Sequence, residues 1–135
     1  MREIIFRGKR IKDNKWVFGH YNFIDAHFIY HYEEEDLRFV LSEVDPETVG
    51  QYTGLVDKNG NKIFEGDIVH VLGNQQVEDW KNVDYIGLLA FLDAGFCVID
   101  GTIGEYSFRR YALSRFDFDL EVIGNIHDNP ELLGE

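Results

Sequence analysis

The sequence contains a single cysteine, Cys97, so an internal disulfide framework is excluded. It contains no apolar run that approaches the roughly 20 residues needed to cross a bilayer as a helix. The first residues, Met1 to Glu3, do not open the apolar segment of a signal peptide. We therefore predict a protein that works in the cytoplasm and has no membrane contact.

Positive charge is scarce as well. Thirteen Lys and Arg stand against 25 Asp and Glu, for a formal net charge of −12. Long-range repulsion from such a surface opposes binding to phosphate backbones and anionic membranes, which argues against a general nucleic-acid-binding protein. Hydrophobic residues still make up 44% of the 135 residues and aromatic residues 15%, which is enough for one domain around a core and excludes a disordered chain.

The motifs of several enzyme classes are absent. There is no Gly-rich phosphate loop, no Gly-x-Ser-x-Gly elbow and no Cys-x-x-Cys pair. Cys97 lies between Phe96 and Val98 in a strand-like run, and this favours a buried, inert thiol over a nucleophile. An alternating row of carboxylates over residues 117–121 is typical of a solvated strand face rather than of a metal site.

Hydrophobic alternation predicts strands in the first part of the chain. We expect a hairpin from residues 4–7 and 16–21, then strands over 26–32 and 37–44. Asp45-Pro46-Glu47-Thr48 combines a capping residue, a proline and an acid, and predicts a short helical turn.

The predicted strand 26–32 alternates two histidines and Ile29 on one face with three aromatic residues on the other. His27 and His31 are separated on it by roughly 13 Å of rise, which is too far for one metal ion. With His20 they form the one histidine cluster, and we predict ordinary histidines and no metal site.

Turn residues divide the second part of the chain into short segments. Asn59-Gly60 is the clearest hairpin turn, residues 73–84 are a polar loop, and Asn129 to Leu133 indicate a capped short helix. The predicted strands are 51–56, 63–64, 68–72, 85–92, 96–100, 106–113 and 116–126, the last with room for a bulge.

The Glu-Gly-Asp-Ile-Val segment that starts at Glu65 looks like the opening strand of many SH3-like barrels. We therefore predict a single domain with a mainly β fold. An N-terminal β-hairpin layer covers residues 1–50, a small SH3-like β-barrel covers 51–135, and one or two short helical turns complete the fold.

Two long motifs, Gln51 to Val69 and Val122 to Leu133, resemble the YopX family, and the opening Arg2 to Arg7 is similar as well. The signature residues are Gln51, Tyr52, Thr53, Gly54, Leu55, Asp57, Asn59, Gly60, Glu65, Gly66, Asp67, Gly124, Asn125, Asn129 and Pro130. The resemblance implies a protein of phages or prophages of Gram-positive bacteria, without a known biochemical function or known catalytic residues.

The glycines of this signature favour a structural role. Gly54 and Gly60 stand where a turn needs positive φ, Gly66 lets the chain bend, and Asp67 can accept backbone N–H groups at that corner. A binding site at the signature is the alternative.

Two surface segments are candidates for interaction. An acidic run could imitate a phosphate backbone, whereas a basic and aromatic run has the composition of a single-stranded nucleic-acid site that the net charge of −12 opposes. The residues are Glu33, Glu34, Glu35 and Asp36 in the acidic run, and Arg109, Arg110 and Tyr111 in the basic run.

These observations favour a non-enzymatic protein of the bacterial cytoplasm, encoded by a phage or prophage and requiring no cofactor. We predict that it binds a host or phage protein or assembles as a homo-oligomer. The alternative is an acidic DNA mimic that inhibits a host nucleic-acid-binding protein. A third hypothesis, a metal-dependent hydrolase, requires a bound divalent ion.

Overall fold

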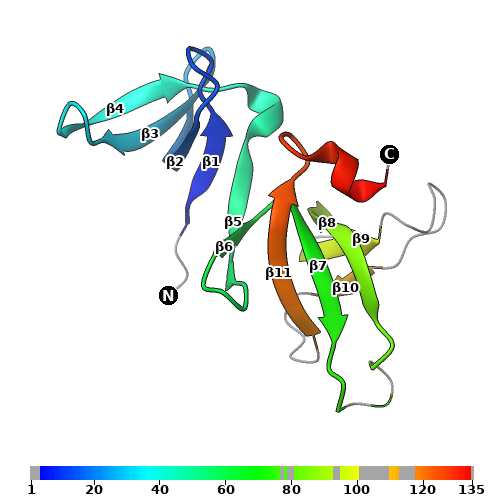
Figure 1. Ribbon diagram of the computed structural model, residues 1–135. Coiled ribbons are helices and arrows are strands. Elements are labelled where there is room, and N and C mark those ends of the chain that lie inside the picture. Colours follow the sequence, from blue (N-terminus) through cyan, green and yellow to red (C-terminus); the bar gives the residue numbers. More distant parts are fainter. Residues whose placement is uncertain are drawn as a thin grey trace. The chain divides into compact units, whose positions relative to one another are not determined.

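A computed structural model describes residues 4–76, 78, 81–92, 95–100, 110–112 and 118–134 (Figure 1). The chain divides into two compact units, Met1–Gly54 and Leu55–Glu135, which are described separately. The first unit contains β1 (Phe6–Lys9), β2 (Trp16–Phe23), β3 (His27–Glu33), β4 (Arg38–Glu43), the 3-10 helix η1 (Pro46–Thr48) and most of β5 (Gly50–Val56). The second contains β6 (Lys62–Phe64), β7 (Asp67–Gly73), β8 (Asp84–Leu92), β9 (Gly95–Asp100), β10 (Arg110–Ala112), β11 (Phe118–Asn125) and the 3-10 helix η2 (Pro130–Leu133).

The first unit is an antiparallel sheet in the order β4-β3-β2-β1-β5. The sheet curls so far that its β4 end returns to the end of β1, where Arg10 and Val44 form a β-bridge. Ile11 donates its N–H to the Glu43 carbonyl and Asp45 donates to the Lys9 carbonyl, both at 2.9 Å. The curl encloses a small core of Val17, Ile29 and Val44.

The second unit is built on an antiparallel sheet in the order β10-β9-β8-β7-β11. Its core is made of the buried residues Ile63, Val69, Val71, Val83, Tyr85, Leu89 and Val98. The pairing of β11 with β7 shifts register between Val122 and Gly124, which confirms the expected bulge in the last strand.

Most of the predicted elements are confirmed. The fold is mainly β, the N-terminal hairpin is the β1–β2 pair, and both helical turns are short 3-10 helices. Asp45 caps η1 by accepting the Glu47 N–H at 3.0 Å. The pairings among the described strands form two sheets and close no barrel, so the SH3-like barrel stays a prediction, as does the single-domain organisation. No helix within the described ranges is long and apolar enough to span a membrane.

One buried carboxylate ties the β5–β6 turn to β11. Asp57 accepts the backbone N–H groups of Asn59 and Asn61 on Oδ1 and that of Val122 on Oδ2, each at 2.9 Å. Gly60, with φ at 85°, closes this turn as expected. Burial raises the pKa of Asp57, but the hydrogen bonds outweigh burial and hold the pKa below its ordinary value of 3.8.

We expect Asp57→Ala to lower the free energy of unfolding at pH 7 by about 3 kcal/mol, because three backbone donors lose their acceptor. A carboxyl whose pKa is lowered by folding stabilises the native state fully above its unfolded pKa, and this contribution is lost as pH falls through the folded value. Urea unfolding at pH 7 and pH 3 should therefore show a smaller difference from wild type at pH 3. A difference that grows on acidification would contradict this role, and Glu131→Ala, at an exposed carboxylate, is the control.

Candidate functional site

One face of the first unit exposes large apolar side chains. In antiparallel sheets directly opposite residues share a face, and the register pairs Tyr30 with Leu41 and Tyr32 with Phe39. Phe18 lies on the same face of β2 because it is two residues from His20, the partner of Tyr30. Phe18, Tyr30, Tyr32, Phe39 and Leu41 form what we call the aromatic face, and they are 41–58% exposed.

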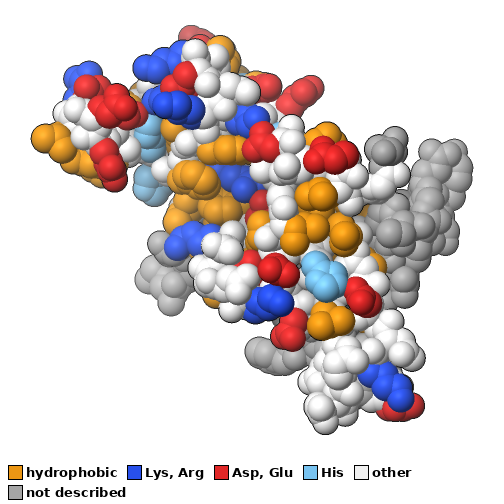
Figure 2. Space-filling view, viewed as in Figure 1, with side chains coloured by type: hydrophobic (Ala, Val, Ile, Leu, Met, Phe, Trp, Pro, Cys, Tyr) orange, Lys and Arg blue, Asp and Glu red, His pale blue; other side chains and the backbone are white. Residues whose placement is uncertain are grey.

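The rings of the aromatic face pack on one another. Tyr30 and Phe39 are stacked at 5.3 Å between centroids, and Tyr32 meets Phe39 edge-on at 5.3 Å. Figure 2 shows hydrophobic side chains at the surface beside the β3–β4 turn, next to side chains of both charges. The predicted alternation in residues 26–32 is thus confirmed: Ile29 and His31 are buried and Tyr30 and Tyr32 are exposed.

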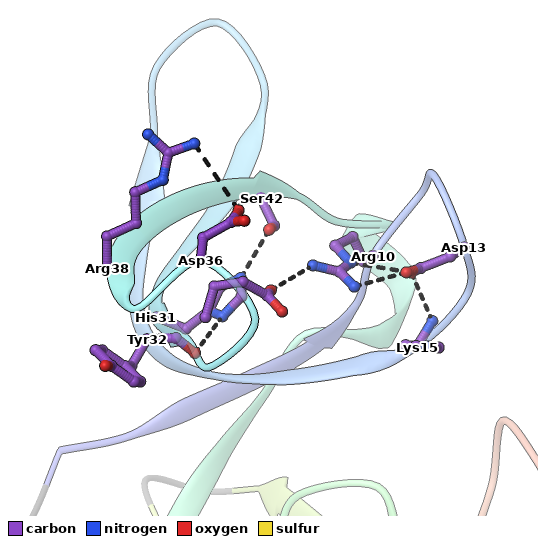
Figure 3. A network of polar contacts seen from close by, with 9 residues as sticks. Arg10, Asp13, Lys15, His31, Tyr32, Asp36, Arg38 and Ser42 are labelled. Atoms are coloured by element: carbon purple, nitrogen blue, oxygen red, sulfur yellow. Dashed lines mark hydrogen bonds and ion pairs between the residues drawn. The ribbon is translucent and has the colours of Figure 1, made fainter.

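A charged groove of about 490 Å³ opens at the rim of the curled sheet. Its walls are the β1–β2 turn, the acidic β3–β4 turn and the strand β4 between them (Figure 3). The lining therefore combines basic side chains from residues 10–15 with carboxylates from residues 33–36.

Arg10 holds the two turns together. Its guanidinium donates to both carboxylate oxygens of Asp13, at 3.0 and 2.6 Å, and to Glu33 Oε2 at 3.0 Å (Figure 3). These hydrogen bonds raise the pKa of Arg10 above its ordinary value. The hydrogen bond from Arg10 also lowers the pKa of Asp13 to about 2, so both groups are charged at neutral pH.

His31 and Ser42 form a buried polar pair inside the curl. His31 Nε2 lies 2.7 Å from Ser42 Oγ, and its Nδ1 lies 3.3 Å from the Tyr32 carbonyl oxygen. These are the atom types of a nucleophile and a base. Both side chains are buried and the bond links neighbouring strands, so the arrangement also serves as a cross-strand tie.

The acidic run predicted as an interaction segment is partly neutralised. Glu33 is bound by Arg10, and Asp36 lies 3.9 Å from Arg38. Glu34 and Glu35 are exposed, and neither forms an ion pair with any residue that the structure describes. The first unit carries seven Lys and Arg against ten Asp and Glu, a net of −3, so −9 of the total −12 belongs to the second unit.

The basic run is not brought into a described site. Arg109 lies outside the described residues, and the backbones of Arg110 and Tyr111 pair with Ile99 and Val98 in β9. Cys97 is buried in β9, as predicted. Within the described part of the chain, no group of three or more His, Cys, Asp and Glu could hold a metal ion.

A second histidine pair lies in the other unit and was not singled out by the sequence. His70 Nε2 is 2.7 Å from Asp84 Oδ1, across the β7–β8 pair. The pair borders a hollow of about 350 Å³, which is otherwise lined mainly by apolar side chains such as Ile86 and Leu132.

The first signature motif forms turns and strand starts. Gly54 and Gly60 have φ of 92° and 85°, which confirms the positive φ predicted for them, although Gly54 lies within β5 and not in a turn. Gly66, where a bend was expected, has φ of 94°. Asp67 is buried and accepts the Phe64 N–H at 2.7 Å, as expected. Gly66 donates to the Leu89 carbonyl and accepts from Ile126 N–H, so this corner joins β8 to the end of β11. The motif also includes Gln51 and Tyr52 in β5, Thr53, Leu55, Asp57, Asn59 and Glu65.

The second signature motif folds the C-terminal turn. Asn125 Oδ1 accepts the N–H groups of His127 and Asp128, at 3.0 and 2.9 Å. The predicted side-chain cap of Asn129 on the helix that starts at Pro130 is wrong: its Oδ1 accepts the Asn125 N–H at 3.3 Å instead. This oxygen lies close to Gly124, where a side chain would collide with it.

Sequence reasoning missed two parts of the site. Arg10 was not singled out, because its partner Glu33 lies 23 residues away and no local pattern marks the pair. The sequence did not assign Phe18, Phe39 and Leu41 to a face, because each adjoins another apolar residue, Val17 or Val40, and polarity does not alternate there.

One of the comparisons with known proteins identifies a family. A family model described as YopX protein matches residues 5–134. The crystal structure of protein EF1440 from Enterococcus faecalis is similar with a TM-score of 0.52 and 24% sequence identity, over 98% of this chain and 99% of that one. This likeness concerns the fold. None of the curated proteins matches the chain.

We expect the Asp13 carboxyl to titrate near pH 2 in wild type and near its ordinary pKa of 3.8 in Arg10→Met, because the guanidinium that stabilises the carboxylate is gone. Carbon-detected NMR of the carboxyl across pH measures both values. Lys58→Met, which removes a cation paired with Glu121, should leave the Asp13 titration unchanged. Identical Asp13 titrations in wild type and Arg10→Met would rule out the contact.

Gly124→Ala should lower the free energy of unfolding by about 1–3 kcal/mol, because the added Cβ overpacks this corner. It would lie 2.7 Å from Asn129 Oδ1 and 2.9 Å from Leu132 Cδ1. Gly95→Ala is the matched control, since a Cβ there meets nothing within 4 Å. Equal urea midpoints for the two variants would show that the close approach at Gly124 is unimportant.

Proposed function

The chain belongs to the YopX protein family, and we propose that it is a non-enzymatic protein-binding domain whose interface is the aromatic face of β2, β3 and β4. The family resemblance adds the proposal that a phage or prophage encodes it and that it acts in the bacterial cytoplasm. The single observation that carries the proposal is the exposure of five large apolar side chains on one face of one small sheet.

The composition of the aromatic face suits a protein partner. Aromatic residues are enriched at the centres of interfaces, and charged residues gather at the rim. Here Tyr30, Tyr32 and Phe39 pack together in the middle, and the charged β1–β2 and β3–β4 turns lie beyond the strands. Contiguous apolar surface of this kind is uncommon on monomeric proteins unless it binds something.

The two histidine pairs support a non-enzymatic role. His31 and Ser42 are buried and joined across strands, so a substrate would need the curl to open to reach the hydroxyl. The described lining of the hollow beside His70 and Asp84 includes no Ser, Cys or Lys, which leaves that pair without a partner nucleophile. We further propose that the signature residues serve the fold, since their side chains and positive-φ glycines form turns and corners.

The DNA-mimic alternative loses support from the ion pairs. A phosphate mimic needs carboxylates that are free to meet a basic partner, whereas Arg10 and Arg38 each face one carboxylate of the run. Glu34 and Glu35 are the remaining exposed acids of this run. Residues 33–36 lie in the first unit, whereas −9 of the total −12 belongs to the second unit, so most of the excess negative charge lies outside the acidic run.

The proposal is tested with a tagged chain expressed in a Gram-positive host that also expresses an untagged copy. We expect a protein, whether of host or phage origin or the untagged copy, to be recovered with wild type and reduced by about tenfold or more with Tyr30→Ser plus Phe39→Ser, as for truncated hot-spot residues. Phe91→Ser, at an equally exposed aromatic residue of β8, is the matched control and should retain it.

Circular dichroism of both variants verifies that they are folded. Recovery that does not depend on the aromatic face would refute the proposal. A different outcome would favour the DNA mimic: the partner is lost at high salt and with Glu34→Gln plus Glu35→Gln, but it is still recovered with Tyr30→Ser plus Phe39→Ser.

A further inference from the structure

We propose that the occupant of this surface is a second copy of the chain, joined by antiparallel pairing of the two β4 strands about a two-fold axis at Val40. The inference rests on the proposed function and names its partner. Three features of β4 lead to it: a free backbone edge, a register that matches itself, and complementary charges at the two ends of the strand.

The first feature is the free edge. β4 is the terminal strand of its sheet. Val44 donates its N–H to the His27 carbonyl at 2.9 Å, and backbone groups alternate in direction along an antiparallel strand. Val40 and Ser42 therefore point their N–H and C=O groups toward β3, and Phe39 and Leu41 point theirs away.

A second hydrogen bond gives the same orientation. The Glu43 carbonyl accepts the Ile11 N–H and so points away from β3, and the backbone groups of Leu41, two residues earlier, point to the same side. No other described residue hydrogen-bonds the backbone groups of Phe39 and Leu41. Free edges are usually protected by a proline, a bulge or a central lysine. The centre of β4, Phe39-Val40-Leu41, has none of these. Ile11 occupies the edge opposite Glu43, so the free part of the edge is limited to Phe39 and Leu41.

The second feature is the register. A two-fold axis at Val40 places Phe39 opposite Leu41 of the second copy, and Leu41 opposite Phe39. Each pair joins two residues whose backbone groups face outward, so each pair can exchange both of its N–H···O=C bonds. The same pairing makes the exposed side chains of Phe39 and Leu41 cross-strand neighbours and continues the aromatic face from one copy into the other.

The third feature is charge. The β1–β2 turn lies at the Glu43 end of β4, where Arg10 and Ile11 meet the strand, and the β3–β4 turn lies at the Arg38 end. Antiparallel pairing brings the acidic turn of each copy beside the basic turn of the other. Lys12 and Lys15 are exposed and form no ion pair with a described residue, so they are available to the acidic turn.

The acidic turn offers Glu34 and Glu35, which are exposed and unpaired within the described residues. The basic and acidic turns thus complement each other twice in the dimer. The first unit, which supplies the proposed contact, carries a net charge of −3, and the other −9 of the chain belongs to the second unit. A second copy therefore fits both the backbone and the charges of this edge.

Sedimentation equilibrium of the full chain tests the dimer. We expect wild type to form dimers, and Leu41→Lys to raise the dissociation constant by about tenfold or more, because it places two lysines in the central contact. Leu41 is half-exposed in one copy, so the variant should fold, which circular dichroism verifies. Phe91→Lys, at an equally exposed site in β8, is the matched control and should change the dissociation constant little.

Charge exchange tests the antiparallel arrangement. Lys12→Glu plus Lys15→Glu should weaken the dimer, and adding Glu34→Lys plus Glu35→Lys to the same chain should restore it. A chain that stays monomeric, a dimer insensitive to Leu41→Lys, or the failure of the second pair of substitutions to rescue would each overturn the inference. A monomeric chain that still recovers a foreign protein through the aromatic face would leave the proposed function standing, so the two failures are distinguishable.

Discussion

The β-bridge between Arg10 and Val44 is the constraint on which the first unit depends. It returns the end of β4 to the end of β1 and so decides which face of the sheet lies inside the curl. Val17, Ile29 and Val44 then form the core, and alternation along each strand places Tyr30, Phe39 and Leu41 outside. The exposed aromatic face is thus a geometric consequence of how the core is enclosed.

The curl of the sheet also determines which charged side chains meet. Because the β1–β2 turn is brought to the rim of the curl, Arg10 can reach both Asp13 in its own turn and Glu33 at the end of β3. This pairing removes one carboxylate from the acidic run and leaves Glu34 and Glu35 exposed at the tip of the next turn. The strand β4 lies between the basic and acidic turns, and its outer edge is bonded to the β1–β2 turn at Glu43 but is free at Phe39 and Leu41.

Local patterns in the sequence predicted most strands, the Asn59-Gly60 turn and the corner at Gly66 and Asp67, because period-two alternation and turn chemistry act over a few residues. They did not predict the bridge from residue 10 to residue 44 or the Arg10–Glu33 contact, which depend on how distant strands meet. The capping of the last helix by Asn129 was wrong for a similar reason: the Asn125 N–H competes for the same oxygen. Of the candidate site, the acidic run and the aromatic alternation were visible in the sequence, but the face that they share with β2 and β4 was not.

The central claim is that the edge of β4 pairs with another strand, and amide hydrogen exchange at Phe39 and Leu41 tests it most directly. The amides of Val40 and Ser42 point toward β3 and should exchange slowly at every protein concentration. Those of Phe39 and Leu41 should exchange fast in dilute solution and slow by about tenfold or more as the concentration rises and the edge becomes paired. Equally fast exchange of these two amides at all concentrations would contradict the claim.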